Sequence, residues 1–292
     1  MSMKLSEMKS PQSTVACALC PHRCALREGA LGFCRARKAE GGKIVPLFYG
    51  NLSSLALDPI EKKPLLHFYP GKNILSVGSL GCNMRCPYCQ NYEISQCDEA
   101  TAPLQTTTRK VEPEELIKLA LQTRSEGNIG LAFTYNEPLV NFEFVLNTAK
   151  LARDHGLETV LVSNGQINPE PLEELLPHLS ALNIDLKCFS EEGYRSLGGD
   201  FQTTLNTIRK ASASGAHVEI TSLIVPGLSD STEAMEKEAA FLADIIPDMP
   251  LHLSRYFPRY KAHEKATDLT LLKELQKIAA KKLRYVHLGN VF

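Results

Sequence analysis

The sequence predicts an α/β fold: a partial, six-stranded parallel β/α barrel preceded by a small cysteine-rich N-terminal module. From residue 73 onward, short apolar runs typical of buried strands alternate with longer stretches of helical periodicity. Before that point, four cysteines lie within eighteen residues of a glycine-rich region that leaves little room for regular structure. About six strand–helix units follow, fewer than the eight of a closed barrel.

Three regions are expected along the 292 residues: a loose tail at 1–14, the cysteine-rich module at 15–72 and the barrel at 73–292. The tail is polar and lacks the apolar centre of a secretory signal. Within the module, residues 43–50 are typical of a strand and residues 58–64 of a proline-bracketed loop. Lys62 and Lys63 of the second segment and the nearby His67 could face an anionic group of a substrate, but a solvated turn is the favoured interpretation.

The composition excludes several classes of function. Hydrophobic residues make up 43% of the chain and charged residues 22%, as in ordinary globular proteins. A net charge of −1 gives no reason to expect binding to nucleic acid or to a membrane surface. No stretch approaches the roughly eighteen apolar residues of a membrane span. Nine cysteines without an export signal indicate the cytoplasm, where such thiols bind metal more often than they form disulfides.

The elements of the barrel follow from local patterns. Helices are expected to begin near Pro113 and Pro138, since proline suits the first turn of a helix, and the first should end before Gly127. Three further helices are expected at about 201–215, 231–246 and 269–282. The expected strands cover residues 74–77, 130–135, 159–162, 182–187, 218–225 and 251–257, with a short terminal strand at 284–288.

Directly after the first of these strands, Cys82, Cys86 and Cys89 form a C-x3-C-x2-C pattern. Gly81 and Pro87 keep this segment irregular, so that it can wrap three thiolates around one metal group. Three thiolates suit a 4Fe–4S cube with one iron left open, because such cubes normally take four cysteines. An open metal position is a place for chemistry, as it is in catalytic zinc sites.

A zinc site is the alternative for this loop, with Cys97 as a fourth ligand. Zinc loops usually contain two C-x2-C pairs, a spacing that this segment does not have. A disulfide is less favoured, because the cysteines indicate a reducing compartment.

The cysteine-rich module contains Cys17, Cys20, Cys24 and Cys34. A loop-rich segment of this size needs a metal or another cross-link to hold its shape, which favours a second metal site. Either zinc or a second 4Fe–4S cluster would satisfy four cysteines, and the sequence does not choose between them. His22 is an alternative ligand, although a histidine in such a loop is more often solvated.

Polar residues stand where the predicted strands end, which is where the chemistry of parallel barrels gathers. Glu137 follows the second strand and can accept hydrogen bonds from an ammonium group, or stabilise a helix N-terminus. Asp185 and Lys187 lie two residues apart on the fourth strand and therefore on one face, as an ion pair or as functional groups. Weaker candidates are Asn136, Asn164, His252 and Arg255.

The cysteine pattern, with the aromatic Tyr88 before its last cysteine, resembles that of the radical S-adenosylmethionine (SAM) enzymes. This resemblance implies that the open iron binds the amino and carboxylate groups of SAM. An electron from the cluster then cleaves the sulfonium, and the resulting 5′-deoxyadenosyl radical abstracts hydrogen from a substrate. Such an enzyme needs a reducing electron donor.

The Ser163-Asn164-Gly165, Asp185-Leu186-Lys187 and Val225-Pro226-Gly227 segments resemble the glycyl-radical-enzyme activases, such as the one that activates pyruvate formate-lyase. This resemblance implies that Asn136 and Glu137 contact the methionyl amino group, that Asp185 and Lys187 lie beside SAM, and that Tyr88 backs the adenine. The cation site of that family would use Ser163 and Asp185, but its further acidic ligand is Val162 here. Thr221 replaces an arginine of the family.

The resemblance narrows to the radical SAM component of the bacterial and archaeal AmmeMemoRadiSam system, from about residue 15 onward. Many of these relatives continue into a cysteine-rich tail, whereas the present sequence ends at Phe292. The matching segments are the Cys17–Cys34 group and residues 58–64, 89–91, 252–256 and 289–291.

Three functions follow as hypotheses. The first is a radical SAM enzyme of the AmmeMemoRadiSam type, acting on a small molecule or a protein. The second is an activase that installs a glycyl radical on a partner resembling pyruvate formate-lyase. The third, from another class, is a non-catalytic zinc-binding scaffold.

Overall fold

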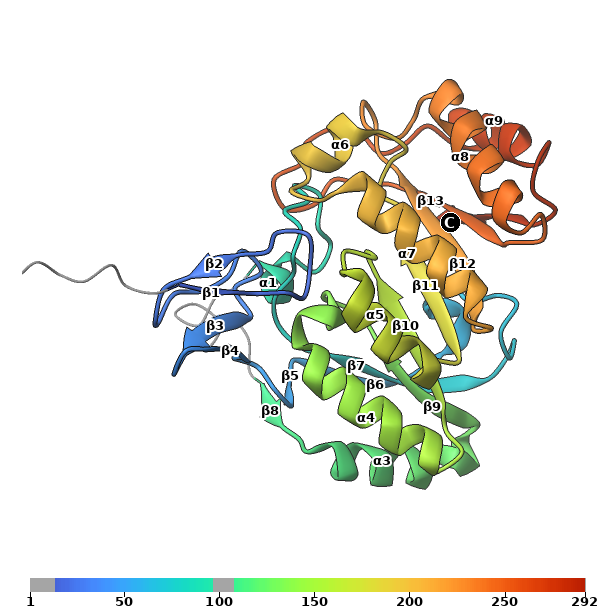
Figure 1. Cartoon of the computed structure of the whole chain (residues 1–292). Coiled ribbons are helices and arrows are strands. Elements are labelled where there is room, and N and C mark those ends of the chain that lie inside the picture. Colours follow the sequence, from blue (N-terminus) through green and yellow to red (C-terminus); the bar gives the residue numbers. More distant parts are fainter. Residues whose placement is uncertain (1–13, 97–107, 292) are drawn as a thin grey trace, which may run out of the picture.

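A computed structural model describes residues 14–96 and 108–291 of the chain (Figure 1). All but the last residue of the expected tail lies outside these ranges, as does Cys97, the alternative zinc ligand. Within them, no helix is both long and apolar enough to cross a membrane.

One eight-stranded sheet forms the centre of the described structure, with its strands in the order β14-β13-β12-β11-β10-β9-β7-β6. Each neighbouring pair is parallel except β6 and β7. The predicted parallel α/β barrel fold is therefore confirmed: the six expected barrel strands and the short terminal strand are present, and β6 adds an eighth, antiparallel strand to the sheet. The strands are β6 (Ser54–Pro59), β7 (Asn73–Gly78), β9 (Asn128–Phe133), β10 (Glu158–Ser163), β11 (Ala181–Asp185), β12 (His217–Ile224), β13 (Leu251–Arg255) and β14 (Val286–Gly289).

Strand β6 was not predicted from the sequence. It runs antiparallel to β7, from Ser54 opposite Gly78 to Pro59 opposite Asn73. Because β6 is an edge strand, the proline at its end breaks no ladder inside the sheet. The central sheet thus begins at residue 54, before the expected domain boundary at residue 72. Residues 15–53 are called the N-terminal module below.

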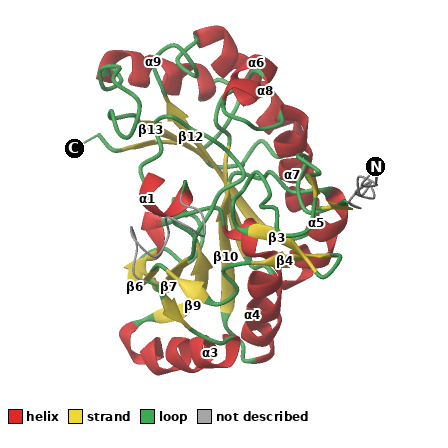
Figure 2. Cartoon of the chain, turned by 90° about the vertical axis from the view of Figure 1, so that its left-hand side faces the viewer, coloured by secondary structure: helices red, strands yellow, loops and turns green. Residues whose placement is uncertain are grey.

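Helices cover the outer side of the sheet, as Figures 1 and 2 show. Prolines occupy the first turn of α3 and of the short helix η3, as the sequence predicts. Asp200, Ser231 and Asp268 cap the starts of α7, α8 and α9 with their side chains. The helices are α3 (Pro113–Gln122), η3 (Pro138–Asn141), α4 (Phe142–Asp154), α5 (Pro169–Leu175), α6 (Glu191–Ser196), α7 (Phe201–Ala213), α8 (Thr232–Ile245) and α9 (Leu269–Ala279).

The N-terminal module packs beside the loop that follows β7. Its strand β3 carries Arg37, which makes a two-pronged ion pair with Glu143 of α4 at 2.8 and 2.6 Å. Gly81 has φ of +91°, and a Cβ atom there would lie 2.7 Å from the Cβ of Ala36. Only glycine fits this close approach. The module's short strands are β1 (Val15–Ala16), β2 (Ala25–Leu26), β3 (Arg37–Glu40), β4 (Lys43–Pro46) and β5 (Asn51–Leu52), the last paired with β8 (Arg109–Lys110).

Glu219 joins the amino end of the sheet to the segment that follows β6. Its carboxylate, which has no exposed surface, accepts hydrogen bonds from the backbone N–H groups of Leu66 (3.1 Å) and His67 (2.8 Å). The ring nitrogens Nε2 of His217 and His252 lie 2.8 and 2.6 Å from it. Burial by itself would raise the pKa of Glu219, but these hydrogen-bond partners outweigh burial and lower it to about 2.

This network corrects the prediction for His252. The sequence places His252 on the sixth predicted strand, and we expected it to bind a cofactor. It lies instead near the start of β13, and its imidazole contacts Glu219. In parallel sheets the amino end is the structural end, and the carboxyl end carries the chemistry.

We expect Glu219→Gln to lower the free energy of unfolding by about 3 kcal/mol at neutral pH, because it leaves buried donors without their charged partner. Since the folded-state pKa lies below the unfolded value, this contribution is complete above about pH 4.5 and is lost as the pH falls towards 2. Urea unfolding at several pH values measures the difference. Glu233→Gln, at a fully exposed pair with Lys237, is the control and should change little. A loss that does not shrink in acid contradicts the assignment.

Candidate active site

A cavity of about 330 Å³ lies at the carboxyl ends of β7, β9, β10 and β11. The structure brings the three cysteines of the C-x3-C-x2-C pattern to its wall, together with every predicted cofactor residue except His252. We call this the cysteine cavity. The sequence-predicted residues that line it are Cys82, Cys86, Tyr88, Cys89, Asn136, Glu137, Asn164, Asp185 and Lys187.

The sulfur of Cys82 accepts hydrogen bonds from the backbone N–H of Met84 (3.4 Å) and from Nδ2 of Asn164 (3.8 Å). Burial raises the pKa of the Cys82 thiol well above its ordinary value, and the thiols of Cys86 and Cys89 raise it further. Bound iron would reverse this effect by favouring the thiolates. The donor set and the hydrogen bonds to sulfur therefore fit an iron–sulfur cluster.

Among the residues that the structure describes, no three side chains of His, Cys, Asp or Glu converge as ligands of one metal ion. A 4Fe–4S cube does not require such convergence, because each cysteine binds a different iron.

Glu137 is the most enclosed acid in the cysteine cavity. Its Oε1 accepts hydrogen bonds from Oγ of Ser163 (2.8 Å) and the N–H of Leu139 (3.1 Å). Its Oε2 accepts from the N–H of Asn164 at 2.8 Å. Burial raises the pKa of Glu137 to about 7, although these donors oppose the shift. A cation in the cavity would favour the carboxylate and meet a group that is already fixed in place.

Asp185 and Lys187 form an ion pair, with Nζ 2.9 Å from Oδ2. Burial by itself lowers the pKa of Lys187, but Asp185 and the thiol of Cys86 raise it overall. Lys187 therefore stays charged beside the cysteines. The side-by-side placement expected from the two-residue spacing agrees with this geometry.

Asn136 and Asn164, which we expected to bind a cofactor, make hydrogen bonds to the cysteine loop and the residues just before it. Asn136 accepts from the N–H of Ser79 (2.9 Å) and donates to the carbonyl of Gly81 (3.0 Å). Asn164 donates to Oδ1 of Asn83 at 2.9 Å as well as to Cys82. Tyr88 is 4% exposed, with its ring edge-on to Tyr256 at 6.3 Å between centroids. These contacts fix the start and the end of the cysteine loop.

Sequence reasoning missed one wall of the cavity. Lys63 was interpreted as part of a solvated turn, but it is 3% exposed and its Nζ lies 2.9 Å from Oδ2 of Asp58. Tyr135 donates to the same oxygen at 2.7 Å, and Lys62 lies 3.1 Å from Oδ1. The two lysines and Tyr135 line the cysteine cavity. The missing signal was β6, whose pairing with β7 places Asp58 within reach of the hydroxyl of Tyr135.

The thiols of the N-terminal module lie close enough to influence one another. Cys17, Cys20 and Cys34 are buried, and Cys24 is half-buried. Burial raises the pKa of Cys20 to about 12, and the other three thiols contribute to the rise. A bound cation would favour the thiolate of Cys20, so these four thiols are a candidate donor set for a metal.

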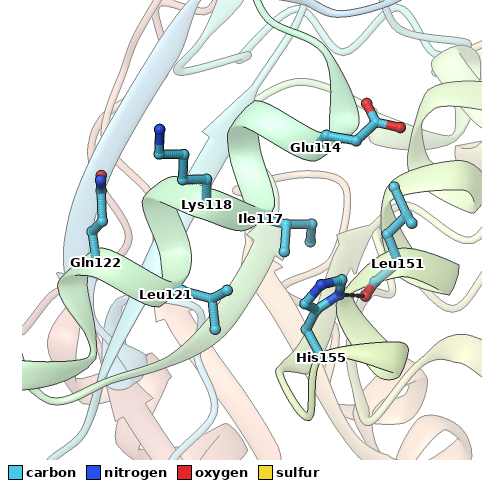
Figure 3. Close-up of a pocket in the computed structure, with 7 residues that line it drawn as sticks. All are labelled: Glu114, Ile117, Lys118, Leu121, Gln122, Leu151 and His155. Carbon is cyan, nitrogen blue, oxygen red and sulfur yellow. Dashed lines mark hydrogen bonds between the residues drawn. The ribbon is translucent and has the colours of Figure 1, made fainter.

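Size alone does not identify the site. A larger cavity of about 450 Å³ lies between α3 and α4 (Figure 3). It is lined by Ile117, Leu121 and Leu151 with a rim of polar side chains, and none of the lining residues is a cysteine.

Comparison with known proteins supports the reading of the cysteine cavity. Residues 76–239, more than half of the chain, match the family described as the radical SAM superfamily. An uncharacterized protein of Methanocaldococcus jannaschii is 36% identical over 97% of this chain and 83% of its own length. The pyruvate formate-lyase-activating enzyme of Clostridium pasteurianum is 30% identical over 56% of this chain and 67% of its own length.

A solved structure agrees at the level of the fold. The radical SAM methyltransferase from Sphaerobacter thermophilus superposes with a TM-score of 0.57 and 16% identity, covering 76% of this chain and 67% of that one. The matched family region contains the cysteine loop, the end of β7 and the four parallel strands β9, β10, β11 and β12. The family implies a 4Fe–4S cluster and SAM, and the thiols of the cavity fit such a cluster. The chain is therefore an enzyme of the radical SAM superfamily.

Proposed function

We propose that this protein is a radical SAM enzyme of the AmmeMemoRadiSam type that abstracts hydrogen from its substrate. One observation carries the proposal: three cysteines, a fixed carboxylate and a charged lysine line a single cavity at the carboxyl ends of the strands. When bound, a reduced 4Fe–4S cluster supplies the electron that cleaves SAM to methionine and a 5′-deoxyadenosyl radical. A cytoplasmic electron donor would provide that electron.

The predicted site residues that line the cysteine cavity have different proposed roles. Cys82, Cys86 and Cys89 would hold the cluster, and Glu137 would accept hydrogen bonds from the ammonium group of SAM. Lys187, paired with Asp185, keeps a positive charge beside the cysteines. Asn136, Asn164 and Tyr88 would keep the loop and the adenine side of the cavity in position.

The proposal is tested by anaerobic reconstitution with iron and sulfide, followed by dithionite and SAM. We expect about four irons at the cysteine loop and formation of 5′-deoxyadenosine. An intact cluster that yields no 5′-deoxyadenosine under these conditions overturns the proposal.

A glycyl-radical activase is the second candidate, favoured by the likeness to pyruvate formate-lyase-activating enzymes. It requires a partner protein that gains a glycyl radical signal in electron paramagnetic resonance when the reconstituted chain and SAM are added. The non-catalytic zinc scaffold is not kept, because the family match establishes an enzyme.

For the N-terminal module we propose a structural metal held by Cys17, Cys20, Cys24 and Cys34: a second 4Fe–4S cluster, or a zinc ion that would require the four sulfurs to move towards one point. Cys20→Ala should release this metal and increase hydrogen exchange within residues 15–53. Mass spectrometry of peptides and metal analysis measure the two effects. Cys188→Ala, which removes a lone buried thiol, is the control and should change neither. Loss of the metal with unchanged exchange would rule out a structural role.

A further inference from the structure

A second cavity, of about 390 Å³, adjoins the cysteine cavity at the ends of β13 and β14. The two share Gln90 and Leu223 in their walls, so their occupants would be neighbours. The remaining lining residues are Arg255, Phe257 and Asn290. We call it the Arg255 cavity. None of the residues that line this cavity is a proposed cluster ligand or a predicted SAM-binding residue.

Arg255 is the last residue of β13 and is held at one end only. Its Nε donates to the carbonyl of Thr267 at 2.9 Å. Thr267 is itself 1% exposed, and its Oγ1 accepts from the N–H of Tyr256 at 3.0 Å, so the anchor is rigid. Within residues 14–96 and 108–291, neither terminal nitrogen of Arg255 makes a hydrogen bond. They are therefore available to a ligand.

Asp268, an acid that interacts electrostatically with Arg255, makes no salt bridge with this guanidinium in the part of the chain that the structure describes. Backbone N–H groups lower the pKa of Asp268, and the charge of Arg255 lowers it further. Oδ1 of Asp268 accepts these hydrogen bonds from Thr270 (2.7 Å) and Leu271 (3.1 Å) at the start of α9. Its hydrogen bonds therefore go to the helix rather than to Arg255.

Phe257 provides an apolar surface next to this charge. It is 41% exposed, and the guanidinium carbon of Arg255 lies 4.9 Å from the centre of its ring. Nε2 of Gln90, a residue of the cysteine loop, donates to the carbonyl of Phe257 at 3.3 Å. The aromatic surface is thus tied to the segment that carries the cysteines.

We propose that the Arg255 cavity binds the anionic group of the substrate, a carboxylate or a phosphate joined to a flat apolar body. A free guanidinium fork binds either anion with two parallel hydrogen bonds. An exposed aromatic ring suits a planar ligand. Residues 255–265 carry four cations and one acid, which adds long-range attraction for an anion. The inference rests on the proposed function, because that places the reacting centre in the adjoining cavity.

The test uses the full chain, reconstituted anaerobically and left unreduced, with benzoate and phenyl phosphate as anionic probes and benzamide as the neutral match. Calorimetry should show at least one anion binding about tenfold or more tightly than benzamide. Arg255→Gln should remove this preference. Arg259→Gln, which removes an exposed arginine stacked on Tyr92 outside the cavity, should keep most of this preference, because the guanidinium fork of Arg255 remains.

Two further measurements test whether the Arg255 cavity binds the anion. Saturating SAM should leave probe binding unchanged, and displacement by SAM would assign the cavity to the cofactor instead. Arg255→Lys keeps the positive charge but removes the two-pronged guanidinium, and it should weaken anion binding several-fold. This variant provides the test if Arg255→Gln does not fold. Unchanged anion binding in a folded Arg255 variant overturns the inference. Since probe binding needs no turnover, this failure is distinct from a failure to form 5′-deoxyadenosine.

Discussion

Cys86→Ala is expected to abolish SAM cleavage and to remove about four irons per chain, the largest effect of any single change considered. Cys86 is 9% exposed and lines the cysteine cavity. Burial raises the pKa of its thiol; Lys187 opposes this shift and Cys89 adds to it. If the three cysteines are the only protein ligands of the cube, as proposed, two of them should not suffice to hold it. Iron analysis, electron paramagnetic resonance of the reduced protein and 5′-deoxyadenosine formation measure the loss.

Cys188→Ala is the matched control for this prediction. Cys188 is 1% exposed and follows Lys187 directly, but it does not line the cavity, and its thiol donates to the carbonyl of Ser190. We expect iron content and cleavage to remain, and circular dichroism to show both variants folded. Retention of the cluster in folded Cys86→Ala would require another ligand and would contradict the three-cysteine assignment.

The parts of the site that depend on local pattern could be predicted from the sequence. The cysteine spacing fixes Cys82, Cys86 and Cys89 on one loop, and the two-residue periodicity of a strand puts Asp185 and Lys187 on one face. Glu137 follows from its place directly after a strand. Each inference needs only that the strands are parallel, because their carboxyl ends then share one edge of the sheet.

The parts that depend on long-range pairing could not be predicted. Asp58 and Tyr135 are 77 positions apart and meet only because β6 pairs with β7. His252 has the same local appearance as a strand-end ligand, but its position within β13 places it beside Glu219. Periodicity gives the face of a strand on which a residue lies and not its height along the barrel. That height decides between a structural and a chemical role.

Glu137→Gln is expected to weaken SAM binding by about thirtyfold or more, because it removes one partner of a buried charge pair. The carboxylate accepts three hydrogen bonds, and an amide in its place would point an N–H group at another donor. The iron content should stay at the native level, since Glu137 is not proposed to bind the cluster. Calorimetry with SAM on the unreduced, reconstituted protein measures the affinity.

Glu238→Gln separates this role from burial alone. Glu238 is 3% exposed, burial raises its pKa to about 7 as for Glu137, and its carboxylate accepts a hydrogen bond from Ser222. It does not line the cysteine cavity. If both glutamates only stabilised the fold, the two variants would lose similar free energy of unfolding and bind SAM alike. A selective loss of SAM affinity in Glu137→Gln, with its iron retained, assigns this carboxylate to the ammonium group, and equal affinities would refute that role.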